Sequence, residues 1–439
     1  MAARRNANGV VFLAVALALT LGFAASSRGP ANRDGGAKLV SIEQLPEIGD
    51  MCLWEPVGAS SRHEDSTESG NLFTALADET VYAAQNVNET TDVARPPVRN
   101  ILDTDPIYSA VTVDTRLNEV YLQDPNTWSI RVFNRLDNTP DSAPRTEAKR
   151  VIGGPNTDVQ FNSCIYVDPK NGEIYSVEND IGDSLVVFSN DANGDVKPIR
   201  KLSVTHRAYA MAVDEDKDEF YLSIQYPPQV AVYSKQASGN DKPRRLIRGE
   251  TTRLSDAHGI AIDAKNKLLF VNNWGNISDY NIPGSGRFEA PSITVFRLDA
   301  DGDAPPVRVI QGAKTQLNWP GAMAVDSDKG EIYVANDVGQ SVIVFRETDK
   351  GDIQPVRALK GAKTGLSYPT GLFVDTKNKE LWAANLGNSS TTVYPLAAGG
   401  NVAPLRTIRS APKGKVSLRF GKTQAVAYDS KREQILVPN

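Results

Sequence analysis

Short hydrophobic runs alternate with polar, turn-forming residues along most of the chain. One stretch reads AMAVD at residues 322–326, then EIYVAN at residues 331–336 and SVIVF at residues 341–345, with Asp, Lys, Gly and Gln between the runs. Runs of five or six residues bounded by turn residues indicate β-strands, and a 3.6-residue helical period is lacking. The pattern therefore predicts antiparallel strands joined by short turns.

This phrase recurs along nearly the whole chain. Each copy holds an aspartate that ends the first strand, and successive copies lie 54, 46, 49, 63, 49 and 54 residues apart. Four-stranded repeats of this length are typical of propeller blades. We expect these residues, called the anchor aspartates below, to fix the turns that follow them rather than to act in chemistry. They are Asp114, Asp168, Asp214, Asp263, Asp326, Asp375 and Asp429.

The last strand of most copies carries a proline followed two residues later by an arginine. Proline cannot donate to a strand ladder and a cation discourages pairing with another molecule, so both mark an edge strand. We therefore expect this strand to be the outermost of its blade, with its arginine on the periphery. The pairs are Pro97/Arg99, Pro198/Arg200, Pro243/Arg245, Pro306/Arg308, Pro355/Arg357 and Pro404/Arg406.

The two ends of the repeat region complement each other. The last copy holds two strands, AVAYD and QILVPN, and two further strands precede the first copy, TVYAAQN from Thr80 and ARPPVRNI from Ala94. The sequence thus predicts an all-β, seven-bladed β-propeller in which N-terminal outer strands and C-terminal inner strands share one blade. Such sharing removes the open edge of a linear array.

The phrase VDSDKGEIYVANDVGQSVIVF at residues 325–345 resembles the repeats of the NHL-repeat and YVTN lactonase-like β-propeller families, and the resemblance covers residues 80–439. It implies the propeller fold. It does not imply one activity, because these families include lactonases, a metal-dependent amidating lyase and non-catalytic recognition domains. The zinc site of the lyase needs histidines from several blades, and this chain has only His63, His206 and His258.

Calcium is the other metal that the resemblance suggests. Gluconolactonase-like propellers hold it with Glu, Asn and Asp side chains at the centre, and Glu178, Asn179, Asn336 and Asn385 could imitate that set. We assign these four residues to a metal only if the protein is a lactonase-type hydrolase. Otherwise no cofactor is favoured.

Charge narrows the range of partners. The 439 residues carry a net charge of −5, and removing residues 1–25, which hold Arg4 and Arg5 but no acidic residue, gives −5 − 2 = −7. Nucleic acids and anionic membranes both need a basic face, so we exclude a nucleic-acid partner.

The N-terminus predicts where the protein acts. Arg4 and Arg5 precede an apolar run over residues 10–25 that ends in small residues, the pattern of a secretory signal peptide at residues 1–25. We therefore expect a secreted or periplasmic protein without a membrane span in the mature chain. An uncleaved anchor stays open as the alternative, although the run is shorter than the roughly 20 residues that cross a bilayer.

Residues 26–78 lack the repeat and are rich in Ser, Gly and charge, so we interpret them as a linker or docked extension before a propeller at residues 79–439. This extension contains Cys52, and Cys164 lies in the second repeat. The two cysteines either form a disulfide in an oxidising compartment or remain buried thiols.

In propellers of this kind, ligands meet the loops after the second strand of each blade and the loops between blades. The first loop position is polar in most copies, where an Asn ring either binds a cation or hydroxyl groups, or caps its strand by bonding to backbone. The regular recurrence favours capping. These positions are Asp124, Asn179, Asn273, Asn336, Asn385 and Asn439.

One copy differs from the others by a long insertion at residues 272–292, and function is expected where repeats differ. The insertion supplies aromatic and polar side chains, His258 begins the inner strand nearby, and such groups together suit a small polar ligand. The alternative is a loop that only covers the central opening. The candidate ligand residues are His258, Asn273, Trp274, Asn276, Asp279, Tyr280, Asn336 and Asn385, with further aromatic surface from Trp128, Tyr226, Trp319 and Tyr368.

These observations favour a non-catalytic module that binds a small polar molecule or another protein through loops on one face. A lactonase-type hydrolase at the central channel is the alternative, with calcium as its possible metal. A structural cell-surface module is the third reading and differs from the first mainly in the size of its partner.

Overall fold

The computed structural model describes residues 99, 101–103, 110–278, 282–388, 390–408, 426–429 and 434–436. The chain divides into two compact units, Met1–Glu64 and Asp65–Asn439, and every described residue belongs to the second. The signal peptide and extension predicted at residues 1–78 lie outside the described residues. In the part that is described, no helix has the length and apolar character needed to cross a membrane.

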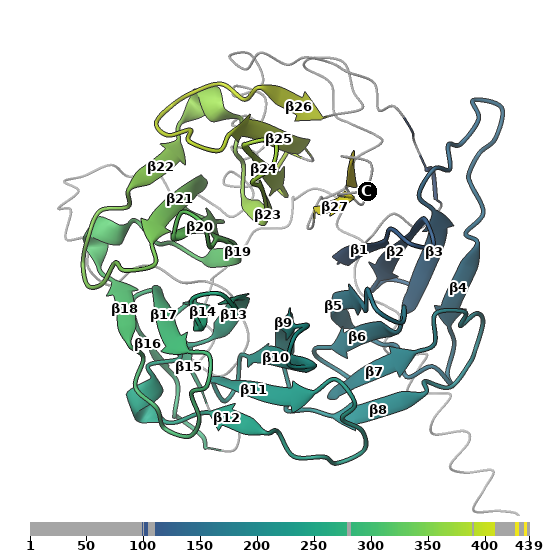
Figure 1. Ribbon diagram of the computed structural model, residues 1–439, viewed down its shortest axis with the longest axis horizontal. Helices are drawn as coiled ribbons and strands as arrows, with labels where there is room; N and C mark the ends of the chain where they lie inside the picture. Colours follow the sequence, from purple (N-terminus) through teal and green to yellow (C-terminus); the bar gives the residue numbers. More distant parts are fainter. Residues whose placement is uncertain are drawn as a thin grey trace, which may run out of the picture. The chain divides into compact units, whose positions relative to one another are not determined.

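The described residues form an all-β β-propeller, as the repeats predict. Six four-stranded antiparallel sheets follow one another in this part of the chain, and we number them as blades 1 to 6 (Figure 1). Blades 1 to 3 consist of β1 (Ala110–Asp114), β2 (Glu119–Asp124), β3 (Ser129–Asn134) and β4 (Arg150–Gly153); β5 (Asn162–Val167), β6 (Ile174–Glu178), β7 (Ser184–Phe188) and β8 (Arg200–Ser203); and β9 (Ala208–Asp214), β10 (Glu219–Ile224), β11 (Gln229–Ser234) and β12 (Arg245–Ile247).

Blades 4 to 6 have the same order, and blade 4 carries the predicted insertion as an extra hairpin. They consist of β13 (Ala257–Asp263), β14 (Leu268–Asn273), β17 (Ser292–Arg297) and β18 (Arg308–Gln311), with the hairpin β15 (Asn276–Ile277) and β16 (Arg287–Phe288); β19 (Pro320–Asp326), β20 (Glu331–Asn336), β21 (Ser341–Arg346) and β22 (Arg357–Lys360); and β23 (Pro369–Asp375), β24 (Glu380–Asn385), β25 (Ser390–Pro395) and β26 (Arg406–Ile408). Short 3₁₀ turns η1 (Glu250–Thr252), η2 (Ala313–Thr315) and η3 (Ala362–Thr364) precede these three blades, and a two-stranded sheet pairs β27 (Ala427–Asp429) with β28 (Gln434–Leu436).

The first strand of each blade is the innermost, and Figure 1 shows these strands around the centre. Neighbouring inner strands such as β9, β13 and β19 lie side by side. The hydrophobic core lies between blades, because both faces of each middle strand are covered. For example, Tyr175 and Leu185 of blade 2 pack in one buried cluster with Phe220 and Leu222 of blade 3. Burial of apolar surface between successive sheets therefore holds the ring together.

The anchor aspartates fix turns, as predicted. Their carboxylates accept backbone N–H groups two or three residues ahead, which is how Asp stabilises a turn. The prediction is confirmed for the six whose side chains are described. The bonds include Arg116 to Asp114 (2.8 Å), Lys170 to Asp168 (2.7 Å), Asp216 to Asp214 (3.1 Å), Asn266 to Asp263 (2.9 Å), Asp328 to Asp326 (3.2 Å) and Asn378 to Asp375 (2.8 Å).

The outermost strands carry the predicted arginines but are not left as open edges. The turn glycine of the next blade bridges each described edge from blade 1 to blade 5, as when the Gly351 N–H donates to the Val309 carbonyl at 2.6 Å. Gly351 has φ +78°, a conformation that glycine adopts without a Cβ penalty. Several of the arginines also pair within their own blade. Arg357, for example, lies 2.7 Å from Glu331.

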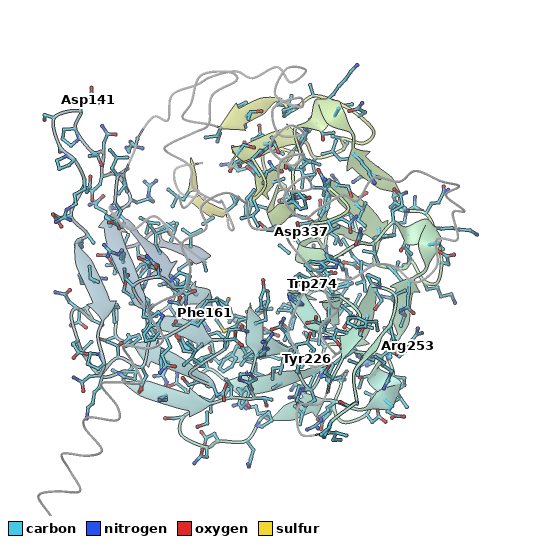
Figure 2. The ribbon with its side chains drawn as sticks, turned by 180° about the vertical axis from the view of Figure 1, so that it is seen from behind. Asp141, Phe161, Tyr226, Arg253, Trp274 and Asp337 are labelled. Carbon is cyan, nitrogen blue, oxygen red and sulfur yellow. The ribbon has the colours of Figure 1, made fainter. Side chains whose placement is uncertain are left out.

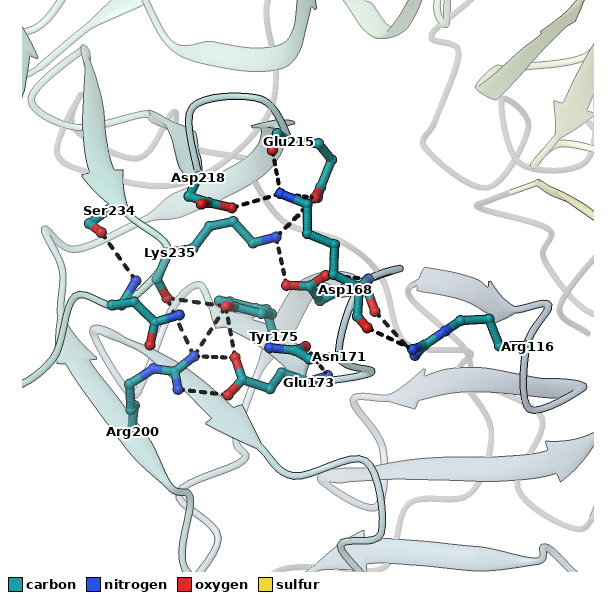
Figure 3. Close-up of polar contacts among 12 residues, drawn as sticks. Arg116, Asp168, Asn171, Glu173, Tyr175, Arg200, Glu215, Asp218, Ser234 and Lys235 are labelled. Atoms are coloured by element: carbon teal, nitrogen blue, oxygen red, sulfur yellow. Dashed lines mark hydrogen bonds and ion pairs between the residues drawn. The ribbon is translucent and has the colours of Figure 1, made fainter.

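A buried ion pair joins blades 2 and 3 on the turn side of the ring (Figure 3). The Lys235 ammonium lies 2.6 Å from the Asp168 carboxylate and 3.1 Å from Glu215, and the lysine is 2% exposed. It also lies 5.5 Å from the centre of the Tyr166 ring. Because both charges are removed from water, each depends on the other.

Blade 5 places an acid at the corresponding position. Glu347 follows its anchor aspartate by the same 21 residues as Lys235, and it faces Asp263 of the preceding blade. Burial, the Asp263 hydrogen bond and the Asp263 charge raise the pKa of Glu347 to about 7. Burial would also raise the pKa of Asp263, but hydrogen bonds from Asn266 and Glu347 hold it below its usual value. Burial beside Asp263 therefore favours retention of a proton on Glu347.

Candidate functional site

Blades 2 to 6 each bring two loop residues together on the face opposite the anchor turns. One lies seven residues before the anchor aspartate and the other eleven residues after it, and the backbone N–H of the second donates to the carbonyl of the first at 2.8–3.1 Å. We call these residues the inner rim. Its described pairs are Phe161/Asn179, Arg207/Gln225, Asp256/Trp274, Trp319/Asp337 and Tyr368/Leu386.

The backbone conformation at the inner rim is unusual. Arg207, Asp256, Trp319 and Tyr368 have φ values of 61°, 52°, 53° and 45°, in the left-handed region. Residues with side chains adopt this region uncommonly, at a cost of roughly 1–2 kcal/mol each. The same conformation recurs at Asn118, Asp218, Lys267 and Lys379 in the anchor turns, so it reflects the repeated loop geometry and does not by itself mark a ligand site.

An aromatic stack runs across blades 3, 4 and 5 at the inner rim. The rings of His258 and Trp274 lie 3.5 Å apart and 8° from parallel, and Trp319 stacks on Trp274 at 4.4 Å and 26°. Tyr209 packs against the other side of His258 at 4.4 Å. Figure 2 shows Trp274 and Asp337 at the inner ends of neighbouring blades.

Close packing of the inner strands makes this stack possible. A Cβ atom on Gly259 in β13 would overlap the Gly321 carbonyl oxygen in β19, so these two strands approach as closely as glycine allows. The Asn272 amide donates to the same carbonyl at 2.6 Å, and the Trp274 indole N–H donates to the Pro320 carbonyl at 3.1 Å. The indole therefore has a fixed position between blades 4 and 5.

Polar partners occupy the edge of the His258 ring. His258 Nδ1 lies 3.0 Å from the Asp256 carboxylate, and its Nε2 lies 2.9 Å from the Gln225 amide nitrogen. Asp256 also accepts the Tyr226 hydroxyl at 2.8 Å, and Asn276 donates to that hydroxyl at 2.6 Å. His258 is 2% exposed, so it orients the stack rather than meeting solvent.

Asp337 is the exception in this network. Its backbone N–H bonds to Trp319, but its Oδ1 atom is buried without a hydrogen-bond partner among the described residues. Burial raises the pKa of Asp337 to about 6, although the nearby His258 opposes the shift. The charges of Asp256 and Asp337 add to burial in raising the pKa of Tyr209 to about 12. The unpaired carboxyl thus lies near the aromatic stack.

The structure therefore brings together three of the predicted ligand residues, namely His258, Trp274 and Asn276. The predicted residues Asp279 and Tyr280 lie outside the described residues. The outer end of the insertion turns to solvent, since Phe288 is 65% exposed.

The predicted asparagines take the capping role. Asn273, Asn336 and Asn385 are 0% exposed, and each Oδ1 accepts a backbone N–H from the loop that enters the same blade. This bond ties two loops together in blades 4, 5 and 6 and explains the regular recurrence. The bonds are Ser255 to Asn273 (3.0 Å), Asn318 to Asn336 (2.6 Å) and Ser367 to Asn385 (3.3 Å).

In blade 2 the capping position lies one residue earlier than predicted, at Glu178 rather than at Asn179. Glu178, ten residues after Asp168, takes the asparagine's place and accepts the Gln160 backbone N–H at 2.6 Å. Asn179 instead belongs to the inner rim and donates to the Ala208 carbonyl at 2.8 Å. The neutral amide and the acid fulfil the same structural role, and burial raises the pKa of Glu178 to about 7.

The set proposed for calcium does not fit the ion. Glu178, Asn336 and Asn385 are 0% exposed and engaged with backbone N–H groups, so they do not present open oxygen ligands. Within the described ranges, no group of three or more His, Cys, Asp or Glu side chains is placed to hold a metal ion. The disulfide stays a prediction, because Cys52 lies outside the described residues. Within the described residues Cys164 has no disulfide partner, and burial raises its thiol pKa to about 11.

The sequence contained a signal for the inner-rim residues that the predicted set omits. Gln225, Asp256 and Asp337 lie at fixed distances from their anchor aspartates, as do the predicted residues Trp274 and Trp319. Aligning each copy on its anchor would have identified the whole inner rim. Tyr209, five residues before Asp214, occupies the same aligned position as His258, five residues before Asp263, although their ring contact requires the structure.

Comparison with protein-family models and with curated protein sequences gives no match. The class that the structure itself defines is an all-β β-propeller. Its candidate site is the part of the inner rim on blades 3 to 5.

Proposed function

We propose that the protein is a non-catalytic binding module that holds a small polar molecule against the inner rim of blades 3 to 5. The carrying observation is the stack of Tyr209, His258, Trp274 and Trp319, which joins three blades beside an unpaired carboxyl group. Aromatic faces with a few convergent polar groups are the usual composition of a ligand site. A segment of another protein is the alternative occupant of this face.

The propeller is proposed to close with a seventh blade. Support comes from β27, which lies beside β1, and from Leu436 and Ile101, which both pack against the hydrophobic residues of blade 1. The Thr146 N–H also donates to the Leu102 carbonyl at 2.8 Å, resembling the turn-to-edge bond between other blades. These contacts are what shared N-terminal and C-terminal strands would make.

The same proposal includes the cellular location of the protein and its family. The basic and apolar residues at 1–25 support secretion or a periplasmic location. The repeated phrase supports membership of the NHL-repeat and YVTN lactonase-like families, in which recognition domains are common.

Replacing Trp319 by alanine is expected to weaken ligand binding at the inner rim. A thermal-shift screen of sugars, polyols, amino acids and amines would identify compounds that stabilise the full-length protein. Trp319→Ala should lose at least about tenfold in affinity for them, because loss of one aromatic anchor costs roughly 1.4 kcal/mol or more. Trp128→Ala is the matched control, since Trp128 is an exposed loop residue of blade 1. Equal effects of the two variants would contradict the proposed site.

A lactonase-type hydrolase is the second candidate, and one observation favours it. The Asp337 carboxyl, whose pKa is raised to about 6, has the protonation behaviour of a general acid or base. If this function holds, the protein opens γ- or δ-lactones with a pH-dependent rate, and Asp337→Asn lowers kcat by at least about 100-fold. The assay measures lactone hydrolysis through the protons that it releases. A rate unaffected by Asp337→Asn would exclude this mechanism.

A further inference from the structure

The charged groups at the inner rim indicate the charge of its ligand. Two carboxyl groups, Asp256 and Asp337, lie at the aromatic stack, and both act electrostatically on Tyr209. Both nitrogens of the His258 ring already have partners. Its Nδ1 lies 3.0 Å from the Asp256 carboxylate, and its Nε2 lies 2.9 Å from the Gln225 amide nitrogen, which also donates to Asp256 at 3.2 Å.

The basic residues of the neighbouring blade are already paired. Arg207 lies 3.0 Å from Asp180, and His206 lies 2.7 Å from Asp183. These contacts engage both basic side chains with acids of blade 2. Asp337 has no salt-bridge partner among the described residues, and its carboxyl group lies near His258 and Tyr209.

We propose that the inner rim binds an organic cation, a protonated or quaternary amine, with Asp337 as its counter-charge and the aromatic stack as its apolar wall. The inference rests on the function proposed above. A positive charge beside aromatic faces is attracted by the ring quadrupoles, most strongly by Trp. A cation would also provide the partner that the buried Asp337 Oδ1 lacks among the described residues.

The test compares choline with its neutral isostere 3,3-dimethylbutan-1-ol by calorimetric titration of the full-length protein. The two probes have nearly the same shape and differ in charge, so the ratio of their affinities isolates the electrostatic contribution. We expect choline to bind at least about tenfold more tightly, and Asp337→Asn to reduce that preference to within about twofold. Asp299→Asn is the control: it removes the same charge from an exposed outer turn, where Asp299 pairs with Arg297, and should preserve the preference.

The possible outcomes separate this inference from the function on which it rests. Equal affinities for the two probes, or a preference that survives Asp337→Asn, would overturn the cationic ligand. If Trp319→Ala still weakened binding of the isostere, the binding function would stand without the charge preference. If neither probe bound, the cation inference would fail, and the screen with Trp319→Ala would decide the proposed function separately.

Discussion

Replacement of Lys235 by methionine is expected to lower the free energy of unfolding by about 3–5 kcal/mol, the usual loss when one partner of a buried ion pair is removed. Methionine keeps most of the side-chain volume but leaves the Asp168 carboxylate without the ammonium 2.6 Å away. Both side chains are at most 4% exposed, so water cannot replace the lost partner. Urea unfolding followed by tryptophan fluorescence measures the loss.

Lys170→Met is the matched control for this prediction. Lys170 also lies near Glu215 and is paired with Asp218 at 2.9 Å, but its side chain is 55% exposed. Exposed pairs contribute about 0–1 kcal/mol, so this variant should unfold at nearly the wild-type urea concentration. Similar losses in the two lysine variants would show that the buried contact between blades 2 and 3 is not a principal source of stability.

Glu347→Gln is expected to increase stability by roughly 2–3 kcal/mol at pH 8 and to change it little at pH 4.5. The folded-state pKa of Glu347 is raised to about 7 from 4.5, so folding retains a proton on this group. The stability that this proton supplies is fully present below pH 4.5 and is lost as the pH rises through 7. The glutamine amide replaces the protonated acid and can still donate to Asp263 at any pH.

The measurement is urea unfolding of both proteins between pH 4.5 and 8. Glu331→Gln in the same blade is a control, because the stability contributed by Glu331 depends on pH in the opposite direction. Hydrogen bonding to Arg357 lowers the folded-state pKa of Glu331 to about 2, so its contribution is present above pH 4.5 and is lost as the pH falls toward 2. A Glu347→Gln variant with the same pH dependence as the wild type would contradict the raised pKa of Glu347.

The propeller could be predicted from the sequence because each blade repeats the same strands and turns. Asp263 and Asp375 form equivalent turns, and the Gly351 turn joins its neighbour as the other turn glycines do, so one copy explains the rest. The edge strands were predicted correctly as outermost. Their bridges to the next blade were not, because a bond between one repeat and the next leaves no mark within a single copy.

The candidate site was predicted only in part, for two physical reasons. The conspicuous insertion directed attention to residues 272–292, yet its tip at Phe288 is exposed and only Trp274 and Asn276 of its described predicted residues join the network. The predicted ligand residues omit Asp337, because nothing in the sequence distinguishes it from the other carboxylates of these polar loops. Its importance depends on burial and on the missing partner at Oδ1, and neither property can be recognised in a linear sequence.

The central claim is that the inner rim holds the ligand, and the indole N–H signals of the tryptophans test it most directly. Trp274 and Trp319 belong to the stack, whereas Trp382 is a buried residue of blade 6 and Trp128 is exposed on blade 1. In a nitrogen-15-labelled protein, a bound ligand should shift the Trp274 and Trp319 signals and leave those of Trp382 and Trp128 in place. Saturable binding that shifts Trp128 or Trp382 but neither stacked indole would contradict the account.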